Sequence, residues 1–217
     1  MSRRHRDLSI RWFEELWNRK RVEVIDDLAS PDLIAEVEGV EGQMGREDMK
    51  DYARAVITAI EDLQVEVTGT LMDPPKVIVD WRATGTHTGA GFGVAPSGQR
   101  VTFRGLTWFE WEGDRLLRGF DRWNRGEVIA SLMQVELQRL RADFGFTPRQ
   151  AQVSLLMAER RTHKEIAKEL GIRPNTARRH CEAVLRKLSL GRREDVADAL
   201  GVRQVTELPM HGADLAR

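Results

Sequence analysis

The stretch from Lys164 to His180, "KEIAKELGIRPNTARRH", predicts two short helices separated by a tight break. Gly171 stands where the end of a helix needs a left-handed backbone, and Pro174 suits the first position of the next helix. About three residues join the two segments, which is the spacing of a helix-turn-helix. Ala167 is small, as expected where two helices cross closely. The stretch therefore predicts a helix-turn-helix unit.

The second helix of this unit has one apolar face and one polar face. Its apolar residues recur at helical spacing, so they must face a core: Ala177, Cys181, Val184, Leu185 and Leu188. In a helix-turn-helix the polar N-terminal face of the second helix enters the major groove of DNA, which predicts contacts from Arg178 and Arg179 to bases and phosphates. The alternative is that this arginine pair is only a solvated helix face. The candidate DNA contacts are Lys164, Asn175, Thr176, Arg178, Arg179, Glu182, Arg186 and Lys187.

Residues 146–190 resemble the LuxR-type helix-turn-helix over their whole length, and this resemblance implies that double-stranded DNA is a partner. The shared motifs are Thr147-Pro148-Arg149, Lys164 to Ala167, Leu170 to Ile172, Thr176, His180 and Leu185 to Leu188.

Three residues depart from the LuxR-type pattern. Gln150 replaces the usual Glu. Arg173 stands where a Ser or Thr normally caps the second helix, so either the cap is lost or Asn175 supplies it. Glu182 stands where some members place a base-reading Lys; a carboxylate there repels phosphate but can accept a hydrogen bond from cytosine N4. The operator sequence therefore does not carry over from the family.

Charge is distributed unevenly along a chain that is neutral overall, with 34 basic and 34 acidic side chains in 217 residues. Residues 146–193 carry twelve Lys and Arg but four Asp and Glu, a difference of +8 that leaves −8 for the rest. A single basic segment indicates a local site for a polyanion. The one cysteine, Cys181, excludes an intrachain disulfide.

The first ~125 residues predict helices followed by strands, an α+β arrangement with an antiparallel sheet. The segment 23–33, "EVIDDLASPDL", is predicted to be a short helix that ends before Pro31. Four β-rich segments between residues 63 and 124 are separated by Pro- and Gly-containing turns. From about Val128 onward the pattern is helical again, so an all-α domain follows.

Residues 5–134 resemble the SnoaL-like polyketide cyclase family, whose cone-shaped α+β fold is shared with ketosteroid isomerase. The markers are the run Gly85 to Gly89 and the turn Pro96-Ser97-Gly98. The resemblance implies a curved sheet that wraps around helices and leaves an apolar pocket of ligand size.

The resemblance also implies a site for acid–base chemistry, of which this chain keeps half. The cyclases use an Asp on the last strand as general acid/base, near a His on the preceding strand. Asp121 of "GFDRW" takes the Asp position, but Thr107 of "GLTWFEW" takes the His position. Asp121 is therefore a weak catalytic candidate. Its alternatives are a hydrogen bond to a ligand hydroxyl and a structural salt bridge to Arg122 or Arg104.

The aromatic content of the first half favours a flat, apolar or aromatic ligand. All six tryptophans lie there: Trp12, Trp17, Trp81, Trp108, Trp111 and Trp123. The candidate ligand contacts are Trp81, His87, Thr107, Phe109, Asp121 and Trp123. We expect no metal and no cofactor, because the five histidines show no ligand spacing and no phosphate-binding motif is present.

Together these features predict four segments: a ligand-binding domain at 1–127, a linker or dimerisation helix at 128–143, a DNA-binding domain at 144–202 and a flexible tail at 203–217. No apolar run approaches the ~20 residues that span a bilayer, and no signal peptide is evident, so we expect a cytoplasmic protein without membrane contact.

The predicted function is that of a homodimeric transcription regulator whose first domain senses a small molecule. In the candidate dimer helix, Leu132, Val135, Leu137 and Leu140 form the contact, unless the helix packs on its own chain instead. The alternatives are a cyclase or isomerase that carries a DNA-binding domain, a relative of sigma factors, and a constitutive dimeric DNA-binding protein. The domain order argues against the sigma-factor alternative.

Overall fold

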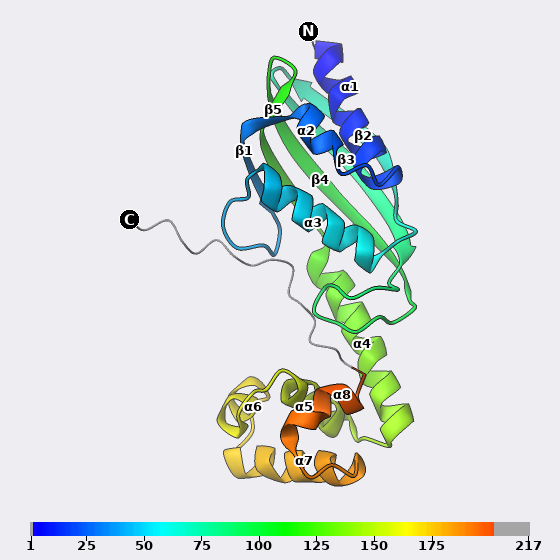
Figure 1. Ribbon diagram of the computed structural model, residues 1–217, viewed down its shortest axis with the longest axis vertical. Helices are drawn as coiled ribbons and strands as arrows, with labels where there is room; N and C mark the ends of the chain where they lie inside the picture. The colour runs from blue at the N-terminus through cyan, green and yellow to red at the C-terminus, as the bar shows by residue number, and fades with distance from the viewer. Residues whose placement is uncertain (1, 202–217) are drawn as a thin grey trace, which may run out of the picture. The chain divides into compact units, whose positions relative to one another are not determined.

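The computed structural model describes residues 2–201 and divides into two compact units (Figure 1). The first unit is built mainly from residues up to Ile129 and the second mainly from Ala130 onward. The predicted domain boundaries at 127/128 and 143/144 stay predictions, because α4 (Arg125–Phe144) runs through both without a break. The predicted flexible tail, 203–217, lies outside the described residues.

The first unit combines helices with one five-stranded sheet, so the predicted α+β class is confirmed. Its elements are α1 (Ser2–Trp12), the π-helical turn η1 (Phe13–Asn18), α2 (Val24–Leu28), β1 (Ala29–Val37), α3 (Arg46–Ala59), β2 (Gln64–Asp73), β3 (Lys76–Thr86), β4 (Arg100–Glu112) and β5 (Arg115–Trp123). The strand order is β1-β5-β4-β3-β2. The helices α1, α2 and α3 lie against one face of this sheet (Figure 1).

The sheet differs from the prediction at β1. Segment 23–33 is helical only over α2; the chain then becomes extended at Ala29, and Pro31 lies inside a strand. β1 pairs with β5 in parallel, so the sheet is mixed rather than wholly antiparallel. Proline is tolerated at this position because β1 is an edge strand and its pairing with β5 is irregular between Ala29 and Ile34. The missing N–H of Pro31 therefore removes no hydrogen bond between the two strands.

Alternation along the strands separates a buried sheet face from an exposed one. On β4, Phe103, Thr107 and Phe109 are buried, whereas Arg104 and Leu106 between them are exposed. Thr107, Phe109 and Trp111 therefore share one face of β4 that is buried against the helices, and Asp121 of β5 lies opposite Thr107 in the register.

The second unit is helical throughout its described residues and contains the predicted helix-turn-helix. Its elements after α4 are α5 (Pro148–Ala158), α6 (His163–Glu169), α7 (Pro174–Lys187), the 3-10 turn η2 (Arg193–Asp195) and α8 (Val196–Ala199). Gly171 has a φ of 61°, the left-handed conformation expected at the end of α6. Ala177, Cys181 and Val184 of α7 are buried in one core together with Ile166 and Ala167 of α6.

Helix caps account for where the helices of this unit begin. Thr147 and Gln150 form a reciprocal capping box: Gln150 N donates to Thr147 Oγ1 at 3.2 Å, and Thr147 N donates to Gln150 Oε1 at 3.0 Å. Gln150 thus replaces the family's Glu without loss of the cap. At α7 the N-cap residue Arg173 makes no side-chain capping bond, so the cap is lost there, and Pro174 at the first position fixes the helix start instead.

Candidate functional site

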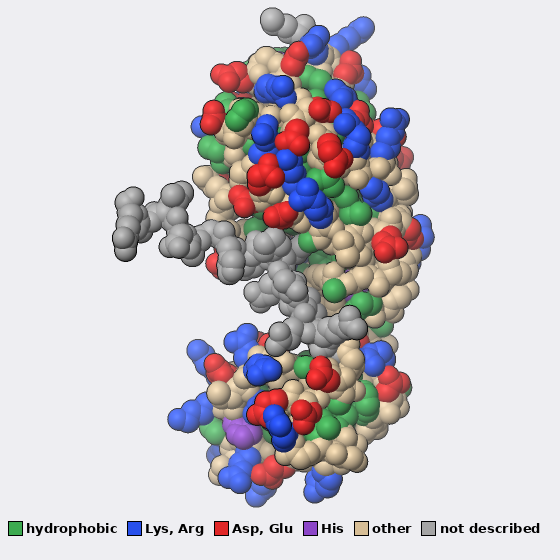
Figure 2. Space-filling view, viewed as in Figure 1, with side chains coloured by type: hydrophobic (Ala, Val, Ile, Leu, Met, Phe, Trp, Pro, Cys, Tyr) green, Lys and Arg blue, Asp and Glu red, His purple; other side chains and the backbone are tan. Residues whose placement is uncertain are grey.

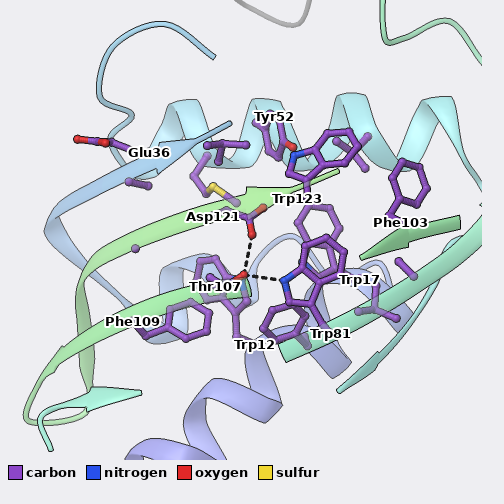
Figure 3. A pocket seen from close by; sticks show the side chains of 18 of the residues that line it. Trp12, Trp17, Glu36, Tyr52, Trp81, Phe103, Thr107, Phe109, Asp121 and Trp123 are labelled. Carbon is purple, nitrogen blue, oxygen red and sulfur yellow. Dashed lines mark hydrogen bonds between the residues drawn. The ribbon is translucent and has the colours of Figure 1, made fainter. Parts of the chain in front are cut away.

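The first unit encloses a cavity between the buried sheet face and the helices α1, η1 and α3. The volume open to the centres of water molecules is about 80 Å³, several times the ~10–15 Å³ that one water needs. Its wall is predominantly apolar and rich in aromatic side chains (Figure 3). The aromatic lining residues are Trp12, Phe13, Trp17, Tyr52, Trp81, Phe92, Phe103, Phe109 and Trp123.

The aromatic rings support one another by edge-to-face packing, which keeps the wall rigid. Phe109 meets Phe13 at 6.0 Å between ring centroids with an interplanar angle of 74°, and Phe103 meets Trp123 at 5.3 Å and 60°. Trp17 meets Tyr52 of α3 at 6.5 Å and 87°.

Polar groups are concentrated at one place in this wall, where three strands bring Trp81, Thr107 and Asp121 together (Figure 3). Trp81 Nε1 donates to Thr107 Oγ1 at 2.9 Å, and Thr107 Oγ1 donates to Asp121 Oδ1 at 2.7 Å. An indole N–H can only donate, so the single hydroxyl proton of Thr107 must point to the carboxylate. Trp81 also lies close enough to the Asp121 carboxylate to lower its pKa by hydrogen bonding.

Burial raises the pKa of Asp121 to about 6, while the hydrogen bond from Thr107 acts in the opposite direction. Near neutral pH the carboxyl group is therefore close to its titration range and can accept or donate a proton. The Tyr52 hydroxyl lies in the same wall, and its pKa is raised by burial and by the negative charge of Asp121. Trp123 Nε1 is buried and finds no hydrogen-bond partner among the described residues.

Five of the six predicted ligand contacts line the cavity: Trp81, Thr107, Phe109, Asp121 and Trp123. His87 does not. It is fully buried behind the wall, where its ring packs against the lining residue Phe92 at 5.9 Å, and burial lowers its pKa. The motif around His87, from Gly85 to Gly89, did not indicate that the ring would pack behind the lining residue Phe92.

The structural alternative for Asp121 is not what the structure shows. Arg122 donates to the main-chain oxygen of Asp121 and pairs with Glu36 at 3.7 Å, and Arg104 pairs with Glu127 at 3.6 Å. The carboxylate of Asp121 thus faces the cavity rather than an arginine.

Several cavity residues were not predicted from the sequence. Trp12, Phe13 and Tyr52 come from helical elements, and Glu36 lies on the unpredicted strand β1. A tyrosine on an otherwise apolar helix face is the one signal that was available, because a buried hydroxyl needs a polar neighbour.

The second candidate site is the exposed face of α7. The predicted DNA contacts on α6 and α7 are all exposed: Lys164, Asn175, Thr176, Arg178, Arg179, Glu182, Arg186 and Lys187. Lys and Arg side chains gather along the margin of this unit, over α6 and α7 (Figure 2). Three of these residues, Arg178, Glu182 and Lys187, have side-chain partners within the chain. Arg178 Nε donates to Glu182 Oε1 at 2.9 Å, and Lys187 Nζ donates to the Gly145 carbonyl.

These features define a class of protein in which an α+β domain with an aromatic cavity precedes a helix-turn-helix domain. The chain belongs to the family described as SnoaL-like polyketide cyclase, which matches residues 7–132, more than half of its length. Residues 145–200 match the family described as bacterial regulatory proteins, luxR family, so a LuxR-type DNA-binding domain follows the SnoaL-like domain. Among the described residues, no helix is long and apolar enough to cross a lipid bilayer.

Solved structures share the fold of the first unit. A candidate SnoaL-like polyketide cyclase from Jannaschia sp. superposes with a TM-score of 0.57 at 20% identity, over 61% of this chain and 93% of that one. AclR, a candidate hydroxylase from Streptomyces galilaeus, gives a TM-score of 0.56 at 24% identity, over 62% and 98%. These identities show the fold alone. Among curated proteins, no match is found.

Proposed function

We propose that the protein is a cytoplasmic transcription regulator whose SnoaL-like domain binds a small, flat, apolar or aromatic molecule and so controls DNA binding by the LuxR-type domain. The observation that supports this most strongly is the aromatic cavity with one polar corner, in the same chain as a DNA-binding domain. The cavity has the apolar wall and the few convergent polar groups that ligand sites share.

The polar corner supports binding more than turnover. Where the cyclases have His, Thr107 is held between Trp81 and Asp121, and its only proton already points to the carboxylate. A threonine hydroxyl in this arrangement orients Asp121 but does not shuttle protons as an imidazole does. Asp121 Oδ2 then accepts a hydrogen bond from a ligand hydroxyl or, when protonated, donates one to a ligand carbonyl.

A cyclase or isomerase is the second candidate, and the pKa of about 6 at Asp121 favours it, because a general base works best near the operating pH. Asp121→Asn separates the two functions, since it keeps the shape and removes the charge. For a sensor, we expect the variant to fold, to lose the small molecule that copurifies with the unaltered protein and to bind DNA as the unaltered protein does after that molecule has been removed. For an enzyme, turnover of a cyclisable polyketone would fall by about 10²–10⁴-fold. Measurable turnover by the unaltered protein would contradict the sensor-only proposal.

A regulator that reads two half-sites about 34 Å apart needs a dimer. The predicted contact on α4 is poorly suited to this, because Leu132 and Leu140 are already fully buried within one chain and Leu140 belongs to the helix-turn-helix core. The exposed face of the sheet offers a better surface. A row of apolar side chains crosses four strands there in register: Leu71, Ile78, Trp108 and Phe120.

We assign this apolar row to a second copy of the chain because the residues that flank it on β3 are complementary in charge. On β3, Asp80 lies on one side of the row and Lys76 on the other, and both are exposed. When two copies pack face to face about a two-fold axis along the row, each Asp80 meets the other copy's Lys76. Trp108 anchors the row: it packs on Phe120 at 4.8 Å and lies under the Lys76 ammonium at 5.5 Å.

A further inference from the structure

The recognition helix α7 presents three exposed arginines, of which one is held by a carboxylate. Arg178 Nε donates to Glu182 Oε1 at 2.9 Å, one turn further along the helix. Arg179 and Arg186 form no ion pair among the described residues. The held guanidinium is restricted in direction, whereas the other two arginines are free to reach phosphates.

The pairing leaves a defined set of hydrogen-bonding atoms facing outward. Because Nε is occupied, Arg178 presents its two terminal nitrogens, Nη1 and Nη2, as a fork of donors. Because Oε1 is occupied, Glu182 presents Oε2 as an acceptor. Read across the pair, the pattern is donor, donor, acceptor. Both side chains are more than half exposed, so the pattern is accessible to a partner.

This pattern is the complement of one base pair in the major groove. A G·C pair presents two acceptors, N7 and O6 of guanine, followed by one donor, the N4 amino group of cytosine. An A·T pair presents the adenine amino donor beside N7, which would oppose the arginine fork. A phosphate presents only acceptors and negative charge, which Glu182 repels.

We propose that Arg178 and Glu182 act as one unit that reads a G·C base pair in each half-site, with Arg178 on guanine and Glu182 on cytosine. Glu182 is thus a specificity-determining residue, although it carries the wrong charge for general DNA affinity. This inference rests on the proposed function as a DNA-binding regulator. Beyond that function, it specifies the base pair that is recognised and the side chains that recognise it.

Selection from a random pool of duplex DNA with the full-length protein tests the proposal. We expect the unaltered protein to enrich a motif with one G·C pair per half-site that is preferred over other pairs by about tenfold or more, the range of a good bidentate contact. Glu182→Ala and Arg178→Lys should each lose the preference at that same position and keep it elsewhere. Glu194→Gln is the matched control, because Glu194 forms a similar exposed pair with Arg192 at 3.1 Å, outside α7.

The outcomes distinguish this inference from the function on which it rests. If the unaltered protein enriches a motif and Glu182→Ala enriches the same motif with the same preferences, the paired readout is wrong while DNA recognition stands. If Glu182→Ala binds all sequences more tightly and by the same factor, Glu182 only repels phosphate, and the inference is also wrong. If the unaltered protein enriches no sequence, the DNA-reading function itself is contradicted.

Discussion

At the scale of single residues, Asp121 concentrates the chemistry of the SnoaL-like domain. Its carboxyl group is buried in an aromatic wall, accepts one hydrogen bond from Thr107 and keeps a second oxygen toward the cavity. Such a carboxyl can hydrogen-bond to ketone, phenol and amide groups. In the proposed sensor, the rings would select the shape of the ligand and this one polar contact would fix its orientation.

The raised pKa of Asp121 makes a prediction about stability. The pKa is about 6 in the folded protein and ~3.9 when unfolded, so the folded state retains a proton that the unfolded state releases. The free energy of unfolding should therefore fall as pH rises from about 4 to 6, and the loss should persist above pH 6. Asp121→Asn removes this titration. Relative to the unaltered protein, the variant should gain at most ~3 kcal/mol between pH 4 and 7, at ~1.4 kcal/mol per pKa unit.

Urea unfolding at a series of pH values, followed by tryptophan fluorescence, measures this difference. All six tryptophans precede residue 124, so fluorescence follows the SnoaL-like domain alone. The lowered pKa of His87 gives the opposite pH dependence, but both proteins share it, and the difference between them isolates Asp121. A difference that is constant from pH 4 to 7 would show that the carboxyl titrates normally.

Five of the six ligand contacts predicted from the sequence line the cavity, because strand alternation placed them on one face. That they contact a ligand stays a prediction. The sequence did not find Tyr52 or Glu36. The position of the Tyr52 hydroxyl depends on how α3 packs against β1 and η1, contacts between separate segments that helical spacing does not encode. His87 does not line the cavity, and only the fold places its ring against Phe92 of the cavity wall.

At the scale of elements, the helix-turn-helix was predicted almost completely, since its caps and apolar spacing are local signals. Strand β1 was missed because "ASPD" has the composition of a turn and because parallel pairing with β5 joins residues far apart in the chain. Pairing with β5 stabilises β1, rather than the strand propensity of its own residues.

The missing N-cap of α7 yields a prediction for that element. Arg173 occupies the N-cap position in an extended conformation without a side-chain hydrogen bond, so Arg173→Ser supplies an acceptor for the free N–H groups of the first turn. We expect the helix-turn-helix unit to gain ~0.5–1 kcal/mol in unfolding free energy, as judged from the helical far-UV circular dichroism signal.

Two observations serve as controls for the cap. Thr162→Ala removes an existing capping box at α6 and should destabilise the same unit by a similar amount. The tryptophan fluorescence midpoint should not change in either variant, because the substitutions lie outside the SnoaL-like domain. A lack of stabilisation by Arg173→Ser would mean that Pro174 alone already satisfies the start of α7.

At the scale of the whole molecule, the proposed dimer face predicts an oligomeric state that one substitution disrupts. Trp108→Glu places a charge in the centre of the apolar row, where face-to-face packing would bury it at a cost of several kcal/mol. Sedimentation velocity should show a dimer for the unaltered protein and a monomer for the variant. Thr102→Glu, on the same strand face but outside the row, should remain dimeric. A dimer that survives Trp108→Glu would place the contact elsewhere.

The central claim is that occupancy of the cavity controls DNA binding, and the affinity of the full-length protein for its selected operator tests this most directly. The measurement compares protein purified from its own cells, with the copurifying small molecule present as judged by native mass spectrometry, and the same protein after that molecule has been removed. We expect the two dissociation constants to differ by about fivefold or more, the lower end of typical allosteric coupling, and the difference to vanish in Asp121→Asn. Equal operator affinity of the loaded and stripped protein, or a native mass that shows no bound molecule, would contradict the account.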